Sequence, residues 1–175
     1  MPRQLVLMRH AQAAPAAFGD IGPQADFNRV LTPHGRDSAR AQGAWLRARA
    51  RAFAPQLVLV SPARRTVETL AALGSFYGDQ KPDIRYVNEL YEATAETVRD
   101  MLYAISDKTS NIMVLGHNPA LGALVFDWAA RHCPPPLEEA MQRGFPPASI
   151  ACFTAEKPWN SATDHEIRLN ALSCQ

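Results

Sequence analysis

The chain has 175 residues, a formal net charge of +1, 47% hydrophobic residues and 20% charged residues. This length suits one domain with a buried core, and the balance of residues excludes a disordered or collagen-like chain. A net charge this close to zero gives no indication of a surface for nucleic acid or for an anionic membrane. We therefore expect a single domain over residues 1–175 with neither nucleic acid nor membrane as a partner.

The cysteines and the N-terminal residues indicate a compartment. Cys133, Cys152 and Cys174 are far apart and form no C-x-x-C pair, which is typical of reduced thiols rather than a disulfide framework or a zinc site. The first apolar run, at 5–8, is too short for a signal peptide. No segment approaches the roughly 20 apolar residues that cross a bilayer. These features predict a soluble, cytoplasmic protein.

Short apolar runs alternate with helical patterns along the chain, which is typical of an α/β domain. Thr32 and Pro33 predict a helix start, as an N-cap followed by proline at the first helical position. The run at 57–60 is apolar throughout, as in a parallel strand buried on both faces. In chain order we expect a strand at 5–8, a helix at 33–52, a strand at 57–60, a helix at 63–73, a strand at 84–87, a helix at 95–105, a strand at 112–115, a helix at 119–130, a loop at 133–136, and strands at 149–155 and 166–172.

Charged and imidazole side chains follow four of the predicted strands. In an open α/β sheet the ligand lies outside the carboxyl ends of the strands, and a sheet needs none of these side chains for its stability. Guanidinium groups match phosphate oxygens well, and positive charge at a helix start, which opposes the helix dipole, indicates an anion nearby. We therefore expect a phosphate site built from the residues after the strands: Arg9, His10, Arg64, Arg65, Glu89, Glu92 and His117.

Each of these residues also has a structural explanation when it is taken alone. A single histidine after a strand is more often an ordinary loop residue, two arginines fit a solvated helix start, and Glu89 and Glu92 would serve as caps for the next helix. Several other sites are excluded by the absence of G-x-x-x-x-G-K-[ST], G-x-G-x-x-G and H-E-x-x-H. No G-x-S-x-G motif is present, so Ser61 is a poor candidate for a nucleophile.

Taken together, the motifs resemble the histidine phosphatase superfamily, which includes the phosphoglycerate mutases, and most closely its small SixA-type phosphohistidine phosphatases. The resemblance covers nearly the whole chain. It implies a three-layer α/β/α sandwich with a mostly parallel sheet, of the phosphoglycerate mutase-like type, without a large insertion over the site. Ala11 stands where most members have glycine. The matching motifs are Arg9-His10 after a strand, R-x-L-T-x-x-G at 29–35, S-P-x-x-R-x-x-x-T at 61–69, L-Y-E-A at 90–93 and G-H-N-P at 116–119.

The resemblance also implies roles for individual residues. His10 is the nucleophile, whose imidazole forms a phosphohistidine intermediate that water then cleaves. Phosphate-binding groups are expected at Arg9, Arg29, Arg65 and His117, and Glu92 matches the acid of larger relatives. Because three arginines neutralise the phosphate, we expect no metal and no other cofactor.

Three functions fit such a site. The first is removal of phosphate from phosphohistidine in a protein, such as a phosphorelay or phosphocarrier domain, since an uncovered site admits a bulky substrate. The second is hydrolysis of small phosphate esters by the same residues. The third is a phosphate-binding module without catalysis, against which the pair His10 and His117 argues, because a binder has no need of a neutral imidazole nucleophile.

Overall fold

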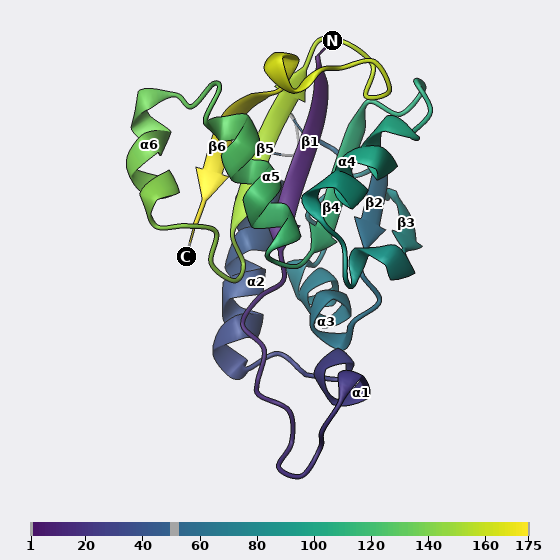
Figure 1. Cartoon of the computed structure of the whole chain (residues 1–175), viewed down its shortest axis with the longest axis vertical. Coiled ribbons are helices and arrows are strands. Elements are labelled where there is room, and N and C mark those ends of the chain that lie inside the picture. The colour runs from purple at the N-terminus through teal and green to yellow at the C-terminus, as the bar shows by residue number, and fades with distance from the viewer. Residues whose placement is uncertain (1, 50–52, 175) are drawn as a thin grey trace.

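The computed structural model describes residues 2–49 and 53–174. Helices and strands alternate over most of the chain (Figure 1). In chain order they are β1 (Arg3–Arg9), α1 (Pro23–Phe27), α2 (Pro33–Arg47), β2 (Leu57–Val60), α3 (Arg64–Leu73), β3 (Asp83–Tyr86), the 3₁₀ turn η1 (Asn88–Leu90), α4 (Ala95–Tyr103), β4 (Asn111–Gly116), α5 (Ala120–Ala129), α6 (Pro135–Gln142), β5 (Ile150–Ala155), the 3₁₀ turn η2 (Asp164–Glu166) and β6 (Arg168–Ser173).

The strands form one sheet in the order β3-β2-β4-β1-β5-β6. The first four strands of this order are parallel to their neighbours, while β5 pairs antiparallel with both β1 and β6. The mostly parallel sheet that was expected is therefore confirmed. Because β1, β2, β3 and β4 run in the same direction, the loops that follow them meet at one edge of the sheet.

Helices cover both faces of the sheet, and the side chains of β1 show how the layers form. Leu5 and Leu7 belong to a core cluster that contains residues of α4 and α5, whereas Val6 and Met8 belong to a second cluster with residues of α2 and α3. Successive side chains of a strand point to opposite faces, so a strand that is apolar at every position fits between two helical layers. The three-layer α/β/α sandwich is confirmed.

The structure differs from the sequence-based expectations at several element ends. Helix α1 was not expected, because five residues are too few for a periodic pattern. Helix α6 begins at Pro135, inside the segment that was expected to be a loop, because prolines are tolerated in a first helical turn whose N–H groups have no partner. Helix α2 ends at Arg47, and the last residues expected in it, 50–52, lie outside the described residues.

Helix caps also differ in one place from the expectation. Thr32 caps α2 as predicted, since its side chain accepts a hydrogen bond from the backbone N–H of Gly35. Helix α4, however, is capped by Thr94 with Thr97 in a reciprocal pair, and Glu89 and Glu92 are exposed and take no part in it. The structural explanation for these two glutamates as caps is therefore wrong.

Helix α1 and the loop before it lie beyond the carboxyl ends of the parallel strands, at the bottom of the view in Figure 1. The segment between β1 and α2 thus borders the edge where the predicted phosphate site is expected. None of the helices within residues 2–49 and 53–174 combines the length and the apolar character that crossing a membrane requires.

Candidate active site

His10 follows β1 directly, and hydrogen bonds fix both its backbone and its ring. Its backbone N–H donates to the carbonyl of Gly116, and its carbonyl accepts from the N–H of Ala148. The ring atom Nδ1 lies 2.8 Å from the carbonyl oxygen of Ala11. A carbonyl oxygen only accepts, so Nδ1 carries the hydrogen and, in the neutral ring, Nε2 keeps a free lone pair. His10 is therefore held in the tautomer that a nucleophilic Nε2 requires.

The surroundings of His10 also keep the ring uncharged. Burial lowers its pKa to about 4, and the positive charges of Arg65, Arg9 and Arg29 contribute to the decrease. The hydrogen bond to Ala11 opposes this shift but does not outweigh it. At neutral pH the imidazole is therefore uncharged and keeps its single hydrogen on Nδ1.

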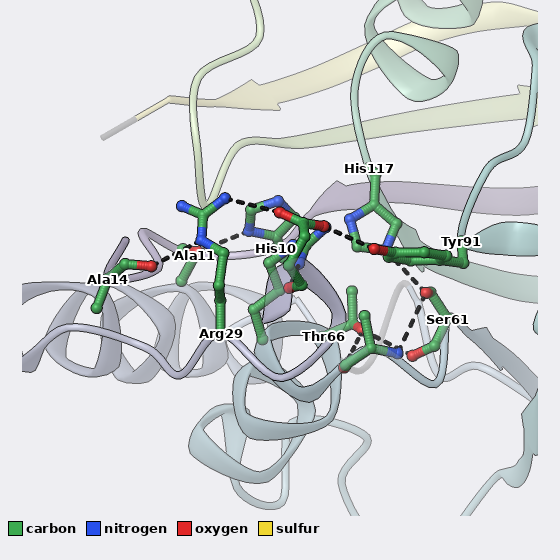
Figure 2. A network of polar contacts seen from close by, with 11 residues as sticks. His10, Ala11, Ala14, Arg29, Ser61, Thr66, Tyr91 and His117 are labelled. Atoms are coloured by element: carbon green, nitrogen blue, oxygen red, sulfur yellow. Dashed lines mark hydrogen bonds and ion pairs between the residues drawn. The ribbon is translucent and has the colours of Figure 1, made fainter. Parts of the chain in front are cut away.

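His117 follows β4 and lies beside His10, with 5.1 Å between the ring centroids (Figure 2). Its Nε2 lies 2.8 Å from Oγ of Ser61, and that oxygen also accepts a weak hydrogen bond from the N–H of Ala63. Burial lowers the pKa of His117 to about 3, with His10 and Arg65 as further causes. Because Ser61 can donate its hydroxyl hydrogen to Nε2, the other ring nitrogen, Nδ1, is free to carry a hydrogen.

Buried polar atoms without partners gather around this place. Within the described residues, the buried side-chain nitrogens and oxygens that lack a hydrogen-bond partner are Nε of Arg9, Nδ1 of His117 and Oγ of Ser149. Arg9 ends β1 and pairs with Gly116, the residue before His117, while the carbonyl of Ser149 accepts from the backbone N–H of Arg9. Buried polar groups are almost always paired in proteins. Two unpaired nitrogens beside His10 fit a site whose ligand supplies the missing acceptors.

Arg9 is held by the loop before β5. One of its terminal nitrogens donates to the carbonyl of Phe145 at 3.1 Å, and the same carbonyl accepts from the side chain of Asn118 at 3.0 Å. Oδ1 of Asn118 in turn accepts from the N–H of Gly122 in α5. Asn118, in the G-H-N-P motif, thereby ties the end of β4 to the loop that orients Arg9.

Arg65 lies in the first turn of α3, buried, and its guanidinium group contacts α1. One terminal nitrogen donates to the carbonyl of Asp26 at 2.7 Å, and the other lies 3.1 Å from its carboxylate. Arg29 donates to the second carboxylate oxygen of Asp26 and, through Nε, to the carbonyl of Ala14. The hydroxyl of Tyr91 donates to Asp26 at 2.7 Å. Figure 2 shows Arg29, Tyr91, His10 and His117 around one place.

Asp26 is thus the negative group in a cluster of positive ones. Burial by itself would raise its pKa, but the hydrogen bonds from Tyr91 and Arg29 and the charge of Arg65 outweigh burial and lower the pKa to about 2. The carboxylate is therefore ionised at neutral pH. It occupies hydrogen bonds of Arg29 and Arg65 that an oxyanion would also use.

A sequence model of the histidine phosphatase superfamily (branch 1) matches residues 5–108. The chain belongs to this superfamily. This histidine phosphatase is also 31% identical over 153 residues to an uncharacterised protein of Mycobacterium leprae (strain TN), across 87% of this chain and 89% of that protein.

Solved structures of SixA proteins resemble this histidine phosphatase over nearly their whole length. The SixA protein of Nakamurella multipartitia, named as a phosphohistidine phosphatase, is 28% identical, with a TM-score of 0.79 over 99% of this chain and 96% of that one. The protein histidine phosphatase SixA in complex with tungstate is 26% identical, with a TM-score of 0.70 over 97% and 95% of the two chains. These findings confirm the expected superfamily and its phosphoglycerate mutase-like fold.

Ala11 follows His10 at the position where the motif resemblance led us to expect glycine. The residue is fully buried and belongs to a small apolar cluster with Leu31, Ala39 and Ala148. Its backbone N–H donates to Oγ1 of Thr69. The methyl group of Ala11 therefore packs into the interior of this histidine phosphatase.

The structure brings together most of the residues that were expected at the site. Arg9, His10, Arg29, Arg65 and His117 lie around one place. Arg64 points its charge elsewhere, since it pairs with Glu68 at 2.9 Å in the same helix. Glu92 is exposed and makes no hydrogen bond or ion pair within the described part of the chain.

Three contacting residues were missed by the sequence analysis as members of the site. Asp26 had a signal, because an acidic residue three positions before Arg29 is placed to pair with it in a helical turn. Tyr91 was noted only as part of a motif. Ser61 was noted as the first residue of a motif and rejected as a nucleophile, whereas its hydroxyl lies 2.8 Å from Nε2 of His117 and orients that ring.

Proposed function

We propose that this histidine phosphatase removes phosphate from phosphohistidine in a protein. The observation that carries the proposal is the state of His10: a neutral ring, with Nδ1 committed to the carbonyl of Ala11 and Nε2 free, among three arginines. A phosphate-binding module without catalysis would not need this tautomer. The likeness to SixA proteins over nearly the whole chain supports a phosphoprotein as the substrate.

The reaction proceeds in two displacements. Nε2 of His10 attacks phosphorus, a bond from nitrogen to phosphorus forms, and the bond from phosphorus to the substrate's imidazole breaks. The substrate histidine leaves as a neutral imidazole when its other ring nitrogen already carries a proton. Water then attacks the phosphorus bound to His10, its proton is lost, and inorganic phosphate and neutral His10 are released.

The positive side chains stabilise the phosphoryl group during both displacements. We propose that Arg9, Arg29, Arg65 and Nδ1–H of His117 hold its oxygens, and preorganised donors of this kind are each worth on the order of 10²–10³ in rate. Three guanidinium groups supply positive charge that other phosphoryl-transfer enzymes draw from Mg²⁺. We therefore propose that the reaction needs no metal. Chelators are expected to leave the rate unchanged, and activity that is lost with a chelator and restored by Mg²⁺ would contradict this.

The substrate is tested by comparing turnover of phosphohistidine domains with turnover of small alkyl phosphate esters. The nucleophile is tested by brief reaction with labelled substrate and an alkaline quench. Because phosphoramidates survive base and decay in acid, a base-stable, acid-labile label on the protein is expected. His10→Ala is expected to lose label and turnover, while His165→Ala, which changes an exposed histidine in η2, retains both.

Two outcomes would contradict the proposal. Turnover by His10→Ala within about tenfold of the unchanged protein would remove His10 from the mechanism, since losing a nucleophile costs far more. Much faster turnover of alkyl esters than of any phosphohistidine domain would instead favour a small-molecule phosphatase that uses the same site.

A further inference from the structure

Two large apolar side chains are fully exposed on the loop between β1 and α1. Among the large hydrophobic residues of the described chain, Phe18 and Ile21 have relative exposures of 109% and 92%, compared with 55% for Tyr86 and 41% for Phe126. We call Phe18 and Ile21 the apolar tip. The loop that carries it extends past α1 at the bottom of Figure 1.

The apolar tip is presented by a defined turn. The backbone N–H of Asp20 donates to the carbonyl of Ala17 at 3.0 Å, which closes a tight turn with Phe18 in its second position. Gly19 follows with a φ of 88°, a conformation that side chains other than glycine rarely adopt. This turn directs Phe18 outward, where no residue of the described chain covers its side chain.

The base of the same loop is part of the phosphate site. Ala14 accepts a hydrogen bond from Nε of Arg29, and its N–H donates to the carbonyl of Val30. At the other end, α1 carries Asp26 and also packs Phe27 edge-on against Tyr91, at 5.1 Å between ring centroids. Both ends of the loop are thus anchored to residues that surround His10.

The apolar tip lies within reach of a macromolecule bound at His10. Phe18 lies four positions after Ala14, so the two are at most about 14 Å apart in an extended chain. Between the tip and the site lies a hollow lined by Pro15, Asp20, Asp26 and Arg29, among others. A folded protein bound through its phosphohistidine is large enough to contact the arginines and the apolar tip at the same time.

The charges of the loop favour a protein over a membrane as the occupant. Residues 11–28 contain no lysine or arginine, and their charged residues are Asp20 and Asp26. Loops and helices that insert apolar side chains into anionic membranes usually carry basic residues beside them. A protein surface with an apolar patch next to its phosphohistidine has no such requirement.

We propose that the apolar tip is a docking surface for the phosphoprotein substrate, where Phe18 and Ile21 contact an apolar patch beside the phosphorylated histidine. This inference rests on the function proposed above. It adds that recognition of the protein is separate from recognition of the phosphoryl group, with the first located on the loop and the second on the arginines.

The test compares two substrates that differ only in what surrounds the phosphoramidate. One is the phosphocarrier or phosphorelay domain, phosphorylated on histidine, that the unchanged protein hydrolyses fastest, and the other is N-phosphoimidazole. The double variant Phe18→Ser with Ile21→Ser is expected to raise KM for the phosphorylated domain about tenfold or more, as loss of an interface anchor does, and to hydrolyse N-phosphoimidazole at the unchanged rate. Phe126→Ser on α5 is the matched control, and the pair Phe18→Leu with Ile21→Val is expected to restore KM.

Each other outcome overturns the proposal in a distinguishable way. If the phosphorylated domain is hydrolysed and the double variant acts on it normally, the docking surface is wrong but the proposed function stands. If both substrates slow equally, the loop acts on the site itself. If no phosphohistidine domain is hydrolysed while alkyl esters are, both proposals fail. If the apolar tip instead mediates binding to vesicles of phosphatidylcholine and phosphatidylserine, with no effect on KM for the domain, the surface binds lipid.

Discussion

Asp26 shares the guanidinium groups that are expected to bind phosphate, so its charge competes with the ligand. Replacing it by asparagine keeps the shape of the side chain but removes the negative charge next to Arg29 and Arg65. The negative charge of Asp26 repels a bound oxyanion a few ångströms away, and this repulsion is strong where the groups are partly shielded from water. We expect Asp26→Asn to bind vanadate or tungstate about fivefold or more tightly, measured as inhibition of hydrolysis.

The opposite result would be equally informative. If Asp26→Asn binds these oxyanions more weakly, Asp26 contributes mainly by orienting the two arginines, and its competition with the ligand is minor. Asp37→Asn is a suitable control, because Asp37 also forms an ion pair with an arginine, Arg40, but on the exposed side of α2.

Glu92 distinguishes the two classes of substrate. Hydrolysis of an alkyl phosphate ester releases an alkoxide whose conjugate acid has a pKa near that of water, roughly 15.7. This leaving group therefore needs a proton in the transition state. Hydrolysis of phosphohistidine releases a neutral imidazole, which needs little general acid catalysis. If Glu92 is the acid, Glu92→Gln slows alkyl ester hydrolysis about tenfold or more beyond its effect on phosphohistidine hydrolysis. Equal slowing of both substrates would assign Glu92 a structural role.

The first turn of α2 packs closely against Gln12, two residues after His10. A Cβ added at Gly35 would collide with the backbone oxygen of Gln12, so only glycine allows the helix and this segment to approach so closely. Thr32 closes the same turn, and its N–H donates to the carbonyl of Gln12. We expect Gly35→Ala to lower the free energy of unfolding by about 1–3 kcal/mol, as overpacking does.

Urea unfolding measures this change. Arg40→Ala in the same helix is the control, and it is expected to stay within about 0.5 kcal/mol of the unchanged protein because the side chain is exposed. A Gly35→Ala protein of unchanged stability and activity would mean that α2 can move away from Gln12 without cost.

Strands and long helices were predictable because their patterns are local. The strand at 57–60 was predicted with the bounds of β2, since four buried apolar residues identify it without reference to the rest of the chain. Strands β1 and β4 begin before the apolar runs, at Arg3 and Asn111, because strand pairing uses the backbone and tolerates polar side chains. Helix α1 was not predictable, because its residues contact the site through Asp26 and Phe27 and show no periodic pattern of their own.

The stability of the whole molecule is expected to depend on pH through its two buried histidines. The pKa of His10 is about 4 and that of His117 about 3 in the folded protein, against 6.5 for an ordinary histidine. As the pH falls below about 6.5 the unfolded chain takes up protons that the folded chain does not, so unfolding becomes more favourable. We expect the free energy of unfolding to be about 1–3 kcal/mol lower at pH 5 than at pH 7.

This expectation is checked by urea unfolding at the two pH values. The double variant His10→Gln with His117→Gln is expected to reduce the difference, because it removes the two groups. The pKa of Asp26 is lowered from 3.8 to about 2 in the folded protein. Its contribution to stability is therefore lost as the pH falls from about 4 to about 2, below the two pH values compared. An unchanged pH dependence in the double variant would mean that the histidines do not cause it.

The sequence by itself determined the order of the six strands and of the helices between them other than α1 and α6, and the positions of Arg9, His10, Arg29, Arg65 and His117 in recognisable motifs. Only the tertiary structure decided which of these groups pair. The sheet order β3-β2-β4-β1 brings loops together that are distant in the chain, so that Ser61 meets His117 and Asp26 meets Arg65 across 56 and 39 positions. Such contacts depend on the packing of whole elements, because hydrogen bonds between loops leave no periodic pattern in the sequence.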